Sequence, residues 1–293
     1  EEWIPGAKVV YEKFEGYVPR SEPASQAAGG KVVKVDRVES LYTPDAATAA
    51  NGLITGELDL LETLSHDLVP LLERSRDVTV APNDPLGYQL FMVINHLHPP
   101  FDKQDARKAV QMAVNQNDFM AAVVGQHTPS RECAAIFGCG AEEGNRFQAL
   151  GWPVRDVAKA RELLRQSGYD GRPVVVMDPA DNAILHPAAL MAADTLKQIG
   201  VNVDLIAMDW SALVQRRASR AAPDQGGWNI FVTNATLTGI ANPLLNIFTR
   251  HCDDAWFGWP CNAKVPELTS AWAVETDIAK RQQIRTELER FHV

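Results

Sequence analysis

Val174-Val-Val-Met177 opens the part of the sequence that decides the fold, which continues through a helical pattern over residues 183–199 to Val201-Asn-Val-Asp-Leu-Ile-Ala207. The first segment is a continuous apolar run, which is typical of a strand buried on both faces. In the middle segment apolar residues recur at helical spacing, at Ala189, Ala192, Ala193, Leu196 and Ile199. This spacing indicates a helix packed flat on a sheet. Strand, helix and strand in this order predict a βαβ unit with parallel strands.

Further strands and helices surround this unit. Strands are predicted over Trp228–Thr233 and Tyr88–Ile94, because both are apolar runs bounded by turn residues. Helices are predicted after Asp102, over 117–124, over 157–166 after Asp156, from Trp210 after Asp209, over 266–274 and over 277–291. On the last of these helices we expect the charged residues, Arg285 and Glu289 included, to face solvent. The fold class is therefore α/β.

The N-terminal part also alternates strands and helices. Strands are predicted over 8–14, 36–43, 58–61 and 78–81, and helices over 46–54, between Asp45 and Gly56, and over 65–74. This alternation indicates an open α/β sheet. Pro82-Asn-Asp-Pro85-Leu-Gly87 is rich in turn residues and predicts a boundary between two lobes, one over residues 1–87 and the other over residues 88–293.

The composition excludes several classes of protein. The chain has 293 residues, of which 46% are hydrophobic, and a net charge of −9. The sequence also shows no cluster of Lys and Arg of the kind that nucleic-acid-binding proteins carry. Arg216 and Arg217 are adjacent, but we interpret them as a solvated helix end. No apolar window is long enough for a membrane span, and we expect a monomer. The chain begins at Glu1 without a leader, so we expect any export signal to have been removed or to lie outside it.

The four cysteines form two close pairs, Cys133 with Cys139 and Cys252 with Cys261. Neither pair has the Cys-x2-Cys spacing of a zinc ribbon, so two disulfides are the simpler interpretation. Each disulfide would stabilise the fold by ~2–3 kcal/mol by restricting the unfolded chain. Disulfides persist in oxidising compartments, and a bacterial periplasm fits that requirement. Zinc bound by cysteines together with His251 or His127 stays open as an alternative.

Motifs for catalysis are missing from the sequence. It contains no nucleophile elbow, no phosphate-binding loop and no His-Glu-x-x-His. His96 and His98 could offer two imidazoles, but Pro99 and Pro100 follow at once and the pair is a weak metal site. His186, at the start of a helical pattern, is expected on the surface. We therefore predict no catalytic residue, no metal and no cofactor.

Aromatic residues indicate binding instead. Trp256 and Trp259 lie in a loop between Cys252 and Cys261, and a disulfide there would fix both indoles on a closed support. Each indole can bury enough area to contribute ~4 kcal/mol before the costs of ordering and association. Trp228 lies in a strand pattern and is equally well interpreted as core. We expect Trp256 and Trp259 to form a pocket wall or a contact between lobes.

Several short motifs follow one another in a fixed order along the chain. They are Pro44-Asp-Ala-Ala-Thr48, Gly56-Glu-Leu-Asp59, Asn95 with Pro99-Pro-Phe-Asp102, Asp156 to Tyr169, Ile199-Gly-Val-Asn-Val203 and Asp209-Trp210. Together they resemble family 5 of the extracellular solute-binding proteins, the peptide, nickel and opine receptors of ABC importers. The resemblance implies a type II periplasmic binding protein fold with two α/β lobes, a ligand in the cleft and a membrane permease as partner. Members of the family extend beyond both ends of this chain, so lobe I is expected to be incomplete.

We predict the following ligand contacts in that cleft: Tyr88, Trp210, Asn234, Thr236, Trp256 and Trp259. Peptide-binding relatives carry an acidic residue in the segment that corresponds to Thr236–Pro243, and this sequence has none there. A simple dipeptide is therefore not favoured, because a buried ammonium needs a partner. An opine, a sugar-conjugated amino acid or a modified peptide fits at least as well, with Asp253 or Asp254 as the carboxylate.

The leading prediction is a periplasmic substrate-binding receptor of an ABC importer, which binds a peptide-like or opine-like molecule without chemistry. A zinc-dependent hydrolase that uses the cysteines and histidines is one alternative. A ligand-binding signalling receptor that docks a chemoreceptor is the other, and the sequence does not divide it from the transport receptor.

Overall fold

The computed structural model describes residues 2–25, 28–82, 84, 86–125, 128, 130–139 and 154–291. Two compact units make up the chain, Glu1–Leu61 and Glu62–Val293. The lobe boundary predicted at residue 87 concerns the ligand-binding lobes, and it stays a prediction.

The first unit contains a small antiparallel sheet. Its strands β1 (Glu2–Ile4), β2 (Lys8–Glu12) and β3 (Arg37–Leu41) pair in sequence order. Helix α1 (Ala46–Thr55) follows, and the Asp45 carboxylate accepts the Thr48 N–H at its start. Gly56 ends the helix in the left-handed conformation, with a φ of 78°. The predicted start and end of this helix are confirmed.

Two strands predicted in the N-terminal part are wrong. Residues 58–61 and 78–81 are not in strands. The chain turns directly after α1, because the N–H groups of Glu57 and Leu58 both donate to the Gly52 carbonyl. A short alternating run forms no strand unless another strand lies beside it to pair with. Residues 62–82 instead hold the 3-10 helix η1 (His66–Leu68) and the short helix α2 (Val69–Glu73), so the described residues of the N-terminal part do not form an open α/β sheet.

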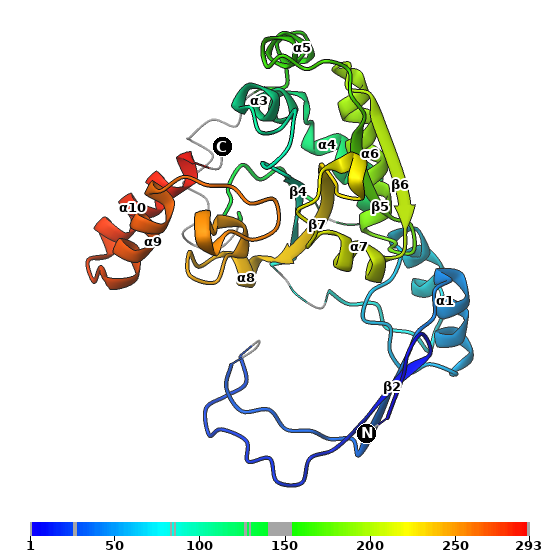
Figure 1. The fold of residues 1–293 in the computed structure, drawn as a ribbon. Coiled ribbons are helices and arrows are strands. Elements are labelled where there is room, and N and C mark those ends of the chain that lie inside the picture. Colours follow the sequence, from blue (N-terminus) through cyan, green and yellow to red (C-terminus); the bar gives the residue numbers. More distant parts are fainter. Residues whose placement is uncertain are drawn as a thin grey trace. The chain divides into compact units, whose positions relative to one another are not determined.

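The second unit is built on a four-stranded mixed sheet. The spatial order is β4 (Tyr88–Ile94), β7 (Ile230–Thr236), β5 (Val174–Pro179) and β6 (Val203–Met208). β5 runs parallel to both β6 and β7, whereas β4 is antiparallel to β7. Helix α6 (Leu185–Gln198) connects β5 to β6 and lies along them (Figure 1). The predicted βαβ unit is confirmed.

Side chains of the sheet alternate between two buried faces. Val176 and Ile230 pack on one face, against apolar residues of the helices α3 (Gln104–Ala113), α5 (Val157–Gln166) and α6. Met177 and Phe231, their neighbours in sequence, pack on the opposite face with Trp228. The side chain of Trp228 is fully buried, which settles its role as core. Helices and loops thus cover both faces, and the strand ends are left to carry polar side chains.

The second unit contains further helices, and the last two of these pack on each other in an apolar cluster with Phe137 that is separate from the sheet core. The further helices are α4 (Gln116–Val124), α7 (Trp210–Arg216), α8 (Leu237–Ile240), α9 (Lys264–Val274) and α10 (Ile278–Arg290), with 3-10 helices over Pro223–Gln225, Ile247–Thr249 and Cys252–Asp254. Asp156 and Asp209 cap their helices as predicted. Asp102 does not cap α3, because that helix begins at Gln104 after Lys103, and Asp102 pairs with the Lys103 ammonium instead.

The outer face predicted for the last helix is partly wrong. Arg285 is 2% exposed and Glu289 is 0% exposed. The Glu289 carboxylate accepts hydrogen bonds from the N–H groups of Ile136 at 2.8 Å and Phe137 at 3.3 Å. Burial raises the pKa of Glu289. These bonds anchor α10 to the segment between Cys133 and Cys139, a contact between distant parts of the sequence that no local pattern reveals.

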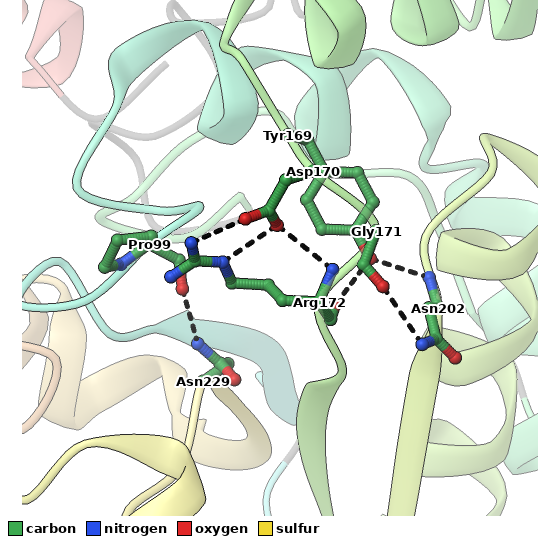
Figure 2. A network of polar contacts seen from close by, with 7 residues as sticks. All are labelled: Pro99, Tyr169, Asp170, Gly171, Arg172, Asn202 and Asn229. Carbon is green, nitrogen blue, oxygen red and sulfur yellow. Dashed lines mark hydrogen bonds and ion pairs between the residues drawn. The ribbon is translucent and has the colours of Figure 1, made fainter.

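Loop residues fix the amino ends of β5 and β6 (Figure 2). The Tyr169 hydroxyl accepts the Asn202 N–H at 2.9 Å and donates to the Arg172 carbonyl at 2.7 Å. The Asn202 side chain donates to the Gly171 carbonyl at 3.1 Å. Asp170 and Arg172 form a bidentate ion pair, in which the Arg172 Nε and Nη2 atoms lie 2.9 and 2.6 Å from the two carboxylate oxygens of Asp170. Hydrogen bonds from Arg172 lower the pKa of Asp170.

Two buried asparagines join three strands at the same end of the sheet. The Asn229 side-chain oxygen accepts the Val175 N–H at 2.9 Å, and its amide donates to the Pro99 carbonyl at 3.4 Å (Figure 2). The Asn95 amide donates to the Trp228 carbonyl at 2.9 Å. Both asparagines are 0% exposed, so water cannot replace these bonds.

We expect Asn229→Ala to lower the free energy of unfolding by about 1–3 kcal/mol, because the buried Val175 N–H then lacks a partner. Asn202→Ala is the matched control, since the hydrogen bond of the Asn202 side-chain amide is exposed. The loss of that hydrogen bond should change the free energy of unfolding by only about 0.5 kcal/mol. Urea unfolding followed by tryptophan fluorescence measures both variants. Equal losses of stability in the two variants would contradict the role assigned to Asn229.

Candidate functional site

The carboxyl ends of three strands meet at one edge of the second unit's sheet. β5, β6 and β7 are parallel, so Pro179, Met208 and Thr236 end on the same side, where antiparallel β4 begins with Tyr88. Ligands of open α/β sheets bind outside the carboxyl ends of the strands. We name this region the carboxyl edge and define it by Tyr88, Asp178, Asp181, His186, Trp210, Asn234 and Thr236.

Three of the predicted ligand contacts come together there. Tyr88 lies directly opposite Thr236 in the β4–β7 pair, and Asn234 lies on the same face one step further in. Tyr88 is 60% exposed, whereas Asn234 and Thr236 are half-buried. The Thr236 hydroxyl accepts the Gly239 N–H at 3.2 Å and so caps α8. The trio offers a phenol, an amide and a hydroxyl to a small molecule.

Trp210 is the fourth predicted contact at this edge. It is the first residue of α7, and its backbone N–H donates to the Asp181 carboxylate at 2.7 Å. Its indole packs against the cluster that contains Val232 on one face of the sheet and against the cluster that contains Met177 on the other. A side chain in contact with both faces of a sheet has to lie over an edge, which here is where β6 ends.

Asp178 and His186 form a pair that the sequence reasoning missed. One carboxylate oxygen of Asp178 lies 2.7 Å from the Nδ1 atom of His186. The Asp178 side chain is 3% exposed and the His186 side chain is 39% exposed. His186 is therefore held at the surface by a buried carboxylate, which is more than the plain surface position expected for it. An acidic residue at the end of the apolar run Val174–Met177 is the signal that could have revealed the pair.

Trp256 and Trp259 lie on the opposite face of the sheet from Tyr88, Asn234 and Thr236. The ring centroid of Trp256 is 5.9 Å from that of Phe231, and that of Trp259 is 5.8 Å from that of Trp228. The Gly258 carbonyl accepts the N–H of His96, two residues past Ile94, and Ile94 lies about 20 Å along β4 from Tyr88. These two half-buried indoles therefore do not lie beside the Tyr88, Asn234 and Thr236 side chains, which are on the other face. Their contact with a ligand stays a prediction.

Both predicted disulfides are present. Cys133 joins Cys139 with a Cα–Cα distance of 5.6 Å, and Cys252 joins Cys261 with a Cα–Cα distance of 4.2 Å. The second disulfide closes the loop that carries Trp256 and Trp259, as expected, and Asp253 and Asp254 are exposed on that loop. Sulfur atoms in disulfides are not available as thiolate ligands for zinc.

The surroundings of the histidines bear on the zinc alternative. Burial, with smaller contributions from Arg107 and His251, lowers the pKa of His96 to about 3. Within the described ranges no three or more His, Cys, Asp and Glu side chains gather as metal ligands would. His127 lies outside those ranges. None of the helices described has the length and apolar character needed to cross a bilayer.

Comparisons with known proteins agree on one family. Residues 1–250 match the profile of the bacterial extracellular solute-binding proteins, family 5 Middle. A probable peptide ABC transporter periplasmic-binding protein, y4tO of Sinorhizobium fredii, is 33% identical over 292 residues, which are 98% of this chain and 55% of that protein.

Solved structures show the same fold. DppA from Helicobacter pylori, in complex with the peptide STSA, matches with a TM-score of 0.77 and 19% identity, over 99% of this chain and 54% of that one. AgaA from A. tumefaciens, in complex with agropinic acid, matches with a TM-score of 0.71 and 16% identity, over 99% of this chain and 56% of that one. The chain spans about half the length of these proteins. Each of the three is described as a binding protein.

We expect His186→Ala to lower the free energy of unfolding by about 1–3 kcal/mol, because it leaves the buried Asp178 carboxylate without its partner. In the Asp178→Asn background the same change should matter less, since no buried charge remains. His98→Ala is the matched control, because that imidazole contacts only an exposed carbonyl among its described hydrogen bonds. Urea unfolding of the four variants measures the coupling, and strict additivity would contradict the pair's role.

Proposed function

Because the chain belongs to family 5 of the bacterial extracellular solute-binding proteins, we propose that it forms the greater part of a ligand-binding receptor of an ABC importer. It binds a peptide-like or opine-like molecule at the carboxyl edge and does not transform it. The observation that carries the proposal is the convergence of Tyr88, Trp210, Asn234 and Thr236 on the end of one sheet, which favours a small-molecule site there.

The chemistry of the carboxyl edge suits a small polar molecule with amide or carboxylate groups. Trp210 and Tyr88 offer aromatic faces, and Asn234 and Thr236 offer donors and acceptors of hydrogen bonds. No acidic residue lies between Thr236 and Pro243, so an ammonium group of the ligand would have to meet a different carboxylate. Asp181 is exposed at this edge, and we assign that role to it.

Names of the relatives support both ligand classes. The relative from Sinorhizobium fredii is called a probable peptide transporter protein, and the two solved structures hold a peptide and agropinic acid. We propose that the ligand lies in a cleft closed by a second lobe, that the receptor works in the periplasm and that it delivers its ligand to a membrane permease. The two disulfides suit an oxidising compartment.

A thermal and chemical unfolding screen of the complete protein tests this function. We expect tri-alanine, glutathione or octopine to stabilise it, by about 2.7 kcal/mol at a concentration of about 100 times the Kd, because a ligand of the folded state shifts unfolding by mass action. Mass spectrometry of the recovered ligand should find it unchanged. The absence of a shift with all three compounds, or the appearance of a product, would refute the proposal.

The position of the site is tested by Tyr88→Ala, which we expect to weaken the binding of the stabilising compound about tenfold with little loss of stability, since Tyr88 is 60% exposed. Leu190→Ala is the matched control, because Leu190 is 43% exposed on α6 and is not among the residues that define the carboxyl edge. Isothermal titration measures both affinities. An unchanged affinity in Tyr88→Ala would contradict the placement of the site at the start of β4.

A further inference from the structure

Arg217 is not the solvated helix end that the sequence suggested. It directly follows α7, and its guanidinium carbon lies 5.8 Å from the ring centroid of Trp210. The same carbon lies 5.3 Å from the ring of Trp256 and 4.9 Å from the ring of Phe257. One cation is therefore in contact with three aromatic rings, which come from two segments far apart in the sequence.

These rings are the main neighbours of the Arg217 side chain. In the part of the chain that the structure describes, no carboxylate is paired with it, and its Nε atom is buried without a hydrogen-bond partner. Burial lowers the pKa of Arg217. Its backbone is fixed as well, because the Trp228 indole N–H donates to the Arg217 carbonyl at 3.1 Å. A partly buried guanidinium of this kind is held by ring faces.

Trp256 and Phe257 belong to a loop that is held by a disulfide and by a backbone hydrogen bond. The disulfide between Cys252 and Cys261 closes their loop, and the Cys252 N–H donates to the Pro260 carbonyl at 2.9 Å. The loop also passes so close to β4 that a Cβ on Gly258 would lie 2.6 Å from the Ile94 carbonyl oxygen. Arg217 therefore contacts both the disulfide-closed loop and the Trp210 indole.

We propose that Arg217 is a positioning residue that holds the Trp210 indole at the carboxyl edge by joining it to the disulfide-closed loop. The consequence for ligand affinity rests on the proposed function, whereas the positioning itself does not. Through this positioning, Trp256 would support the site by its contact with Arg217, without touching the ligand. The Cys252–Cys261 disulfide would in the same way help to fix the position of Trp210.

Arg216 provides a matched comparison. It is the last residue of α7, directly before Arg217, and its guanidinium donates to the Gly227 carbonyl at 2.7 Å, without a ring contact among those described. A role in stability alone would make the two arginines equivalent. A positioning role makes Trp210 sensitive to Arg217 and insensitive to Arg216.

Fluorine NMR of the 293-residue chain labelled with 5-fluorotryptophan tests the proposal without any ligand. The Trp210 signal is assigned by its disappearance in Trp210→Phe. We expect Arg217→Met to shift and broaden this signal, Arg217→Lys to restore it in part and Arg216→Met to leave it in place. Replacing both Cys252 and Cys261 by Ser should move the same signal, because the support of Trp256 and Phe257 is then lost.

A Trp210 signal that is unchanged in Arg217→Met, or that moves equally in Arg216→Met, overturns the proposal. If Arg217→Met fails to fold, Arg217→Lys keeps the test decisive, because a Trp210 signal in Arg217→Lys identical to that of the wild type would contradict the expected partial change and overturn the proposal. Far-UV circular dichroism confirms folding of each variant.

Tri-alanine serves as the probe for affinity in the complete protein. We expect Arg217→Met to weaken its binding about 3- to 30-fold, the range that corresponds to loss of a cation–π contact, and to have no further effect in the Trp210→Ala background. Arg216→Met should bind it as the wild type does. Failure of tri-alanine to bind the wild type counts against a simple peptide ligand, while the NMR result still decides the positioning role.

Discussion

The parallel pairing of β5 with both β6 and β7 is the constraint on which the candidate site depends. Because the three strands run in one direction, their last residues gather at one edge, and antiparallel β4 adds its first residue there. Both faces of the sheet are occupied by apolar clusters, so polar side chains collect at the strand ends. Tyr88, Asn234, Thr236 and Trp210 come from three separate segments, and the direction of β5 brings them together.

On the opposite face of the sheet lies a loop that is linked to the carboxyl edge through Arg217. The loop closed by Cys252 and Cys261 packs its aromatic side chains on Phe231 and Trp228, toward the other end of β7. Arg217 spans the space between that loop and Trp210. We propose that the loop affects the site through packing, as the support for the contact between Arg217 and Trp210. Direct contact of Trp256 and Trp259 with a ligand stays a prediction.

Local patterns in the sequence predicted much of the fold, because they depend on neighbouring residues. The βαβ unit, the start of α1 at Asp45 and both disulfides are confirmed, and so is membership of the family suggested by the motifs. Contacts between distant segments were missed. The Asp178–His186 pair requires α6 to fold back over β5, and the burial of Arg217 requires a loop 39 positions away (256 − 217). A charge beside a helix end is usually solvated, so sequence alone favoured the wrong interpretation.

Photo-crosslinking tests most directly the claim that ligand binds at the carboxyl edge. A tri-alanine analogue with a diazirine side chain is bound to the complete protein and irradiated, and the labelled residues are identified by mass spectrometry. The account predicts labels at Tyr88, in residues 178–186, at Trp210 and in residues 234–240 within this chain. Labels concentrated in residues 252–261, with none at those positions, would contradict it.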